Sequence, residues 1–171
     1  MNPAESFGSE GSSPRLTSCA RISGSASTSL YVRFSRVTTG AGVREGADLY
    51  QPACRLPAEG YYFRPTLFTG VTQSHRIARE EIFGPVLSVL TFRTVEEAVE
   101  KANNTPYGLS AGVWTDKGSR ILKLSTELKA GVVWANTYNK FDPTSPFGGY
   151  KESGFGREGG RQGLLDYVTL G

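Results

Sequence analysis

The sequence predicts an α/β fold in which a largely parallel sheet is flanked by helices. Three features predict it: short apolar runs rich in β-branched residues, amphipathic segments between them, and breaks at glycine and proline. An alternating order of strands and helices favours right-handed crossovers between parallel strands. The 171 residues allow one domain of ordinary size or part of a larger one.

The composition excludes several classes of protein. A net charge of +3 is too small and too dispersed to indicate a nucleic acid or anionic membrane partner. No apolar run approaches the roughly 18 residues of a membrane span. Two cysteines and one histidine form neither a disulfide framework nor a zinc site. We therefore expect a soluble protein of the cytoplasm without a metal, and organelle targeting stays open.

Residues 1–40 differ in composition from the rest. Residues 1–36 contain ten serines and only two acids, Glu5 and Glu10. Such a stretch buries too little apolar surface to offset its ordering entropy, which predicts disorder. One alternative is an organelle transit peptide, since the sequence is rich in Ser and Arg from about residue 11. Another is the product of an altered reading frame or splice. We take residues 41–171 as the folded part.

The folded part opens with a helix end and extended segments. Gly42–Ala47 is typical of a helix end with glycine stops, and a short strand follows at Asp48–Tyr50. The aromatic-rich segment Tyr61–Phe68 is extended, and Pro65 places it at a sheet edge or makes it a connection. Val86–Phe92 predicts a buried strand, because it has the length and β-branched content of one.

Two helices and two strands come next. Thr94 and Glu97 have the spacing of a capping box, so a helix begins there and ends before Pro106. We expect Asp116 to cap the second helix, which Gly131 ends. The strands are predicted at Leu109–Thr115 and Val132–Asn136, and a last short helix at residues 161–168.

Residues 137–160 form a long loop rich in glycine and proline. The loop contains Phe141, Phe147, Tyr150 and Phe155 among its glycines. Because disordered linkers are poor in aromatic residues, these side chains predict an ordered loop. The loop follows the carboxyl end of a strand, where open α/β sheets bind ligands. The alternative is that the aromatic side chains only pin the loop to the core.

Two further short patterns have a functional and an ordinary interpretation. Gly154–Gly159 matches G-x-G-x-x-G, but no apolar strand precedes it, so we assign tight turns and close backbone approach instead of dinucleotide binding. Glu80 and Glu81 lead into a predicted strand through Gly84-Pro85. One carboxylate there could be held against a ligand hydroxyl; solvated surface acids are the alternative.

Four segments follow one another along the folded part: E-E-I-F-G-P-V, N-N-T-P-Y-G-L-S-A-G-V-W-T, G-V-V-W-A-N and F-D-P-T-S-P-F-G-G-Y-K-E-S-G-F-G-R-E-G-G. In their order and approximate spacing these segments resemble the carboxy-terminal part of the NAD(P)-dependent aldehyde dehydrogenase superfamily, and the resemblance runs over about residues 41–168. The resemblance implies an incomplete α/β catalytic domain that works with a separate Rossmann-like cofactor domain, usually in a dimer or tetramer. The implied reaction is NAD- or NADP-dependent oxidation of an aldehyde to a carboxylic acid.

The resemblance also implies roles for four residues. Glu81 resembles the carboxylate that holds the nicotinamide ribose hydroxyls, and Phe83 resembles its neighbour in the nicotinamide pocket. Phe141 and Phe147 resemble the aromatic wall of the aldehyde channel.

No catalytic residue is assigned. The family's G-Q-x-C nucleophile and E-L-G-G general base have no counterpart in this sequence. Cys19 and Cys54 precede Glu81 in the sequence by too few residues to be the family nucleophile, and we take both as ordinary thiols. We therefore expect a truncated form that lacks the nucleophile and the cofactor domain and is inactive alone. The alternative is a non-catalytic short isoform that binds full-length aldehyde dehydrogenase subunits.

Overall fold

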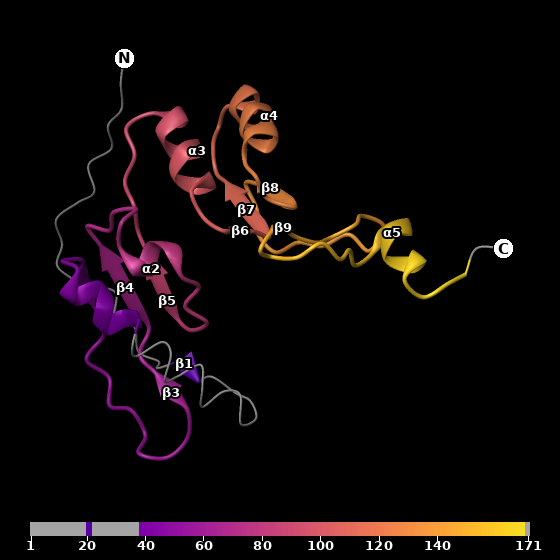
Figure 1. The fold of residues 1–171 in the computed structure, drawn as a ribbon. Coiled ribbons are helices and arrows are strands. Elements are labelled where there is room, and N and C mark those ends of the chain that lie inside the picture. The colour runs from indigo at the N-terminus through magenta and orange to yellow at the C-terminus, as the bar shows by residue number, and fades with distance from the viewer. Residues whose placement is uncertain (1–19, 22–37, 170–171) are drawn as a thin grey trace. The chain divides into compact units, whose positions relative to one another are not determined.

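The structure is a computed structural model that describes residues 20–21 and 38–169 (Figure 1). The predicted Ser-rich segment falls almost wholly outside these residues, so its disorder, and the boundary at residue 41, stay predictions. The chain divides into two units, Met1–Leu90 and Thr91–Gly171. Helices are interspersed with strands through the described residues, which confirms the α/β class. Of the five strand pairs among these residues, three are antiparallel and two parallel, so the sheets are mixed and not largely parallel as predicted.

The first unit contains a three-stranded sheet in the order β2-β4-β5. β4 lies in the centre, antiparallel to β2 and parallel to β5. A separate antiparallel pair joins β1 to β3, and Pro65 lies in the connection between β3 and β4, one of its two predicted roles. The elements are β1 (Ala20–Arg21), a helix over residues 38–44, β2 (Asp48–Tyr50), β3 (Tyr62–Phe63), β4 (Thr66–Thr69), α2 (Arg76–Arg79) and β5 (Val86–Ser88).

The core of the first unit surrounds Phe68 of β4, which is fully buried. Ala47, Val71 and Ile77 pack with it, and Ile77 brings α2 onto the sheet. The helix over residues 38–44 packs closely against Ile77 of α2, because a Cβ on Gly42 would lie 2.8 Å from the side chain of Ile77. One face of the sheet is therefore covered from within the unit.

Strand β5 is shorter and more exposed than the predicted buried strand Val86–Phe92. It ends at Ser88, and the side chain of Leu87 is 62% exposed. Alternate side chains of a strand point to opposite faces. Val86 packs against the core and the Ser88 hydroxyl donates to the Ile77 carbonyl, whereas Leu87 belongs to the opposite, uncovered face. The prediction of full burial is wrong, because the described residues of the unit cover one face of the sheet and leave Leu87 exposed on the other.

The second unit contains a parallel pair, β7 and β8, and an antiparallel pair, β6 and β9. Helix α4 connects the parallel strands, as the alternating pattern predicted. The strands predicted at Val86–Phe92, Leu109–Thr115 and Val132–Asn136 do not share one sheet, because β5 pairs with β4 in the first unit. The elements are α3 (Val95–Asn103), β6 (Tyr107–Gly108), β7 (Ser110–Val113), α4 (Gly118–Glu127), β8 (Val132–Ala135), β9 (Tyr150–Lys151) and α5 (Gly160–Leu165).

Helices α3 and α4 lie side by side (Figure 1). The amide of Asn103 at the end of α3 donates to the Glu127 carbonyl at 2.9 Å and accepts from the Lys129 N–H at 2.8 Å. Both groups belong to the end of α4, where backbone groups lack partners within the helix. The side chain of Asn103 therefore completes the hydrogen bonding of its neighbour.

The predicted capping box of α3 is present in a shifted form. The Thr94 hydroxyl accepts from the Glu97 N–H at 3.1 Å, as predicted. The Glu97 carboxylate reaches back to the N–H of Arg93 at 2.8 Å, one residue before the N-cap, and pairs with Lys101 at 2.8 Å. The hydrogen bond from Lys101 and then that from the Arg93 backbone lower the pKa of Glu97 to about 2.

The predicted cap of α4 is wrong. Lys117 occupies the N-cap position and makes no side-chain capping bond. The Lys117 N–H instead donates to the Thr115 hydroxyl at 3.2 Å. This local turn shifts the helix start by one residue, so Asp116 lies just outside the helix.

The long loop folds back on itself. Phe147 and Glu158 form an antiparallel bridge with two backbone hydrogen bonds of 2.7 Å, and β9 within the loop pairs with β6. A Cβ on Gly131 would collide with the carbonyl oxygen of Gly148. The backbone pairing agrees with the predicted ordered loop. The close approach that we assigned to Gly154–Gly159 is present at Gly159, where a Cβ would lie 2.9 Å from the Ser145 carbonyl oxygen, and absent at Gly156, where a Cβ would meet none of the described residues within 4 Å.

We expect Gly131→Ala to lower the free energy of unfolding by about 2 kcal/mol, because the added methyl group must displace the Gly148 backbone. Urea denaturation measures the change. Gly118→Ala is the matched control, since a Cβ there meets nothing within 4 Å. The control should leave stability unchanged or raise it by about 0.5 kcal/mol. Equal losses for the two variants would contradict the close approach.

The pKa of Glu97 predicts a stability difference that depends on pH. A carboxyl group whose folded pKa lies near 2, below its ordinary 4.5, stabilises the fold above pH 4.5, and this contribution disappears as the pH falls toward 2. Wild type should therefore exceed Glu97→Gln in urea midpoint near neutral pH, and the gap should close in that window. Glu100→Gln, on the same helix, is the control for loss of one charge. A gap that is constant with pH would refute the assignment.

Candidate functional site

Two adjacent acids precede β5, and they have different environments. Glu80 binds Arg76 through two hydrogen bonds of 2.9 Å each, and this pairing raises the pKa of Arg76. Glu81 is exposed and makes no hydrogen bond or ion pair with any residue that the structure describes. Of the two carboxylates, only that of Glu81 is available to a ligand.

The backbone around Glu81 is held by its neighbours. Ile82 packs against the core of the first unit, while Glu81 and Phe83 on either side of it are exposed. A tight turn follows, in which the Gly84 N–H donates to the Ile82 carbonyl at 2.8 Å. An anchored residue between two exposed ones presents a carboxylate and an aromatic ring together, and the ring of Phe83 is 58% exposed.

In the second unit five aromatic side chains form a connected set, which we call the aromatic cluster: Trp114, Trp134, Tyr138, Phe141 and Phe147. The rings of Phe141 and Phe147 meet edge to face, with centroids 4.9 Å apart. Trp134 contacts Phe141 at 5.6 Å and Tyr138 at 4.8 Å. Such edge contacts are favourable beyond the area that they bury.

Trp134 anchors the aromatic cluster to the sheet. It lies on β8, is buried, and its indole N–H donates to the Lys140 carbonyl at 2.8 Å. Phe141 is exposed and Phe147 is half-buried. The cluster therefore both pins the loop to the strands and presents an apolar surface, so the two interpretations of the loop aromatics are compatible.

Sequence reasoning missed Asn136 and Tyr138. The Asn136 side chain accepts from the Thr115 N–H at 2.9 Å and donates to the Thr115 carbonyl at 3.0 Å. These bonds tie together the carboxyl ends of β7 and β8. Asn136 has a φ of 52°, a conformation that asparagine tolerates better than most residues. An asparagine directly after a strand was the available signal.

The predicted site residues are thus placed in pairs. Glu81 and Phe83 lie in the first unit, and Phe141 and Phe147 make direct ring contact in the second. Cys54 is disulfide-bonded, so its assignment as an ordinary thiol is wrong; spacing in the sequence does not report which sulfur atoms meet. Cys19 lies outside the described residues.

Within residues 20–21 and 38–169, no three His, Cys, Asp or Glu side chains gather to hold a metal ion. None of the helices in this part of the chain is long and apolar enough to cross a bilayer.

Comparison with known proteins identifies the family. Residues 33–170 match the aldehyde dehydrogenase family. The chain belongs to this family. An aldehyde dehydrogenase from Enchytraeus buchholzi is 52% identical over 130 residues, which cover 76% of this chain and 26% of that protein. Aldehyde dehydrogenase, cytosolic 1, from Rattus norvegicus is 46% identical over 130 residues, with the same coverage.

Solved structures of the family have the same fold. An NAD-dependent aldehyde dehydrogenase from Sinorhizobium meliloti superposes with a TM-score of 0.77 at 44% identity, covering 82% of this chain and 28% of that one. The chain spans about a quarter of the length of the curated relatives that it matches. It thus corresponds to part of the aldehyde dehydrogenase fold.

Proposed function

We propose that this chain supplies part of the cofactor site and part of the aldehyde site of an enzyme that oxidises aldehydes to carboxylic acids with NAD or NADP. The observation that carries the proposal is the exposed, unpaired carboxylate of Glu81 beside the exposed ring of Phe83. The family membership supplies the reaction, and the NAD-dependent relative of known structure supports the cofactor.

The residues present fit a nicotinamide cofactor. An ionised carboxylate accepts hydrogen bonds from two neighbouring hydroxyl groups, such as those of a ribose. Glu81 has both oxygens available, and Glu80 is already bound to Arg76. Phe83 offers an apolar face to the nicotinamide ring. When bound, the nicotinamide accepts a hydride from the substrate.

The aromatic cluster suits the aldehyde side of the site. Phe141 and Phe147 form an apolar wall for an uncharged substrate, and Trp134 fixes that wall to β8. Side chains in fixed positions hold a substrate in one orientation, which lowers the entropic part of the activation free energy. We assign these residues to substrate positioning and assign no catalytic residue in this chain.

We propose that the 171 residues by themselves are inactive, because no G-Q-x-C or E-L-G-G segment occurs among them. The name of the rat relative supports a cytoplasmic location. Assembly with other aldehyde dehydrogenase subunits is also proposed, by family.

A non-catalytic role as a binding partner of full-length subunits is the second candidate. A specific observation favours it: the uncovered face of the β2-β4-β5 sheet carries an apolar cavity of about 590 Å³. Tyr50, Leu67 and Leu87 line it, and apolar surface of this kind is normally covered by protein.

A chimera tests the principal proposal. Residues 41–168 of this chain would replace the matching segment of the Sinorhizobium meliloti enzyme, and NADH formation would be followed with an aldehyde. We expect activity, and we expect Glu81→Gln to lower kcat/KM for NAD⁺ by about tenfold or more. Glu80→Gln is the matched control and should change it by less than about twofold, because that carboxylate is exposed and paired within the chain.

The second part of this experiment uses the isolated chain, from which we expect no aldehyde-dependent NADH formation. An active chimera that is indifferent to Glu81→Gln would overturn the role of this carboxylate. Robust activity of the isolated chain that disappears with Cys19→Ala would overturn its assignment as an inactive form.

A further inference from the structure

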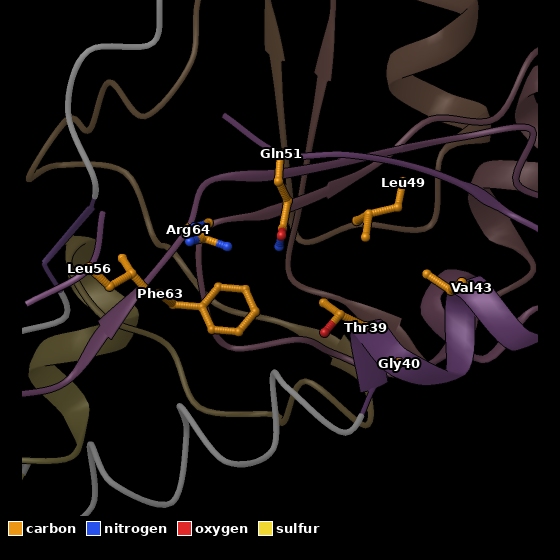
Figure 2. Close-up of a pocket in the computed structure, with 8 residues that line it drawn as sticks. All are labelled: Thr39, Gly40, Val43, Leu49, Gln51, Leu56, Phe63 and Arg64. Carbon is orange, nitrogen blue, oxygen red and sulfur yellow. The ribbon is translucent and has the colours of Figure 1, made fainter. Parts of the chain in front are cut away.

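A second cavity, away from the Glu81 segment, lies between the helix over residues 38–44 and the strands β2 and β3 (Figure 2). Its volume is about 370 Å³, within the range of small-molecule sites. Four apolar side chains contribute to its lining: Val43, Leu49, Leu56 and Phe63. Val43 and Leu49 are 48% and 44% exposed, so a ligand there would remove apolar surface from water.

The polar side of this cavity is formed by Gln51 and Arg64, which Figure 2 shows on the same side of the cavity. Both are tied to Thr66, which is buried. The Thr66 hydroxyl accepts from the Gln51 amide at 2.8 Å and donates to the Arg64 carbonyl at 2.8 Å. Arg64 Nε also donates to the Cys54 carbonyl at 3.1 Å. The Thr66 bond fixes the Arg64 backbone, and the Nε bond positions the guanidinium before any ligand arrives.

None of the residues that the structure describes balances the charge of Arg64. Nε is used, but the two terminal nitrogens have no acceptor among the residues that the structure describes. The described lining of the cavity contains no Asp or Glu. Guanidinium groups form their strongest hydrogen bonds with carboxylates and phosphates, in a paired geometry.

We propose that this cavity binds a monocarboxylate with a medium-length alkyl chain. The carboxylate would pair with the terminal nitrogens of Arg64, and the alkyl chain would lie on Val43, Leu49, Leu56 and Phe63. One guanidinium balances the single charge of a carboxylate, whereas a doubly charged phosphate would need further cations that the described lining lacks. The inference is separate from the proposed function, since it concerns other residues and its test measures binding alone.

Calorimetric titration of the full 171-residue chain with octanoate, and separately with octanol, tests the site. We expect saturable binding of octanoate, weakened by about tenfold or more in Arg64→Gln, with octanol binding unchanged by that substitution. Arg79→Gln is the matched control, because Arg79 is exposed and does not line the cavity. It should bind octanoate as wild type does.

A second variant removes the space and keeps the charge. Among the described residues, a Cβ on Gly40 would meet the tip of Arg44 alone, at 3.4 Å, and Gly40 lines the cavity, so we expect the side chain of Gly40→Leu to fill it. We expect this variant to lose binding of both octanoate and octanol. Absence of saturable octanoate binding, equal affinity in wild type and Arg64→Gln, or binding that survives Gly40→Leu would each overturn the proposal. Equally tight binding of inorganic phosphate would overturn the assignment to a monocarboxylate.

Discussion

The second unit depends on one close backbone approach, that of Gly131 to Gly148. Gly131 directly precedes β8, and its N–H donates to the Gly108 carbonyl at 3.0 Å. The Gly148 carbonyl lies where a side chain on Gly131 would begin. Only glycine fits such a contact. Because the loop lies directly on the strand there, Phe147, the residue before Gly148, is carried into contact with Phe141.

The candidate residues of each unit have an anchored neighbour in the chain. Ile82 packs against the core of the first unit and lies between Glu81 and Phe83, and Gly148 lies against Gly131 next to Phe147. These anchors fix the backbone that carries the candidate side chains. The Glu80 carboxylate, by contrast, is bound to Arg76. Backbone position and local pairing together distinguish Glu81 from Glu80.

Local signals in the sequence predicted some local interactions and not others. The Thr94 cap lies within one turn of its partner, and the ordered loop was predictable from its aromatic content. The Asp116 cap was predicted on the same kind of signal and failed, because the turn between Thr115 and Lys117 starts α4 one residue later. The exposure of Leu87 was not predictable, because it depends on which sheet face is covered by distant segments. The bonds between Asn136 and Thr115 join residues 21 positions apart, and no pattern in the sequence relates them. Glu81 was found through its resemblance to a family motif, since nothing local distinguishes it from Glu80.

Amide hydrogen exchange of the wild-type chain, followed by NMR, tests most directly whether the loop is held against the strands. The N–H groups of Phe147 and Glu158 bond across the loop, and those of Val132 and Asn136 bond between the strands. If the close approach fixes the loop, the Phe147 and Glu158 amides should be protected to a similar degree as the Val132 and Asn136 amides. Exchange of the two loop amides at the rate of an unstructured peptide, with the strand amides still protected, would contradict this account.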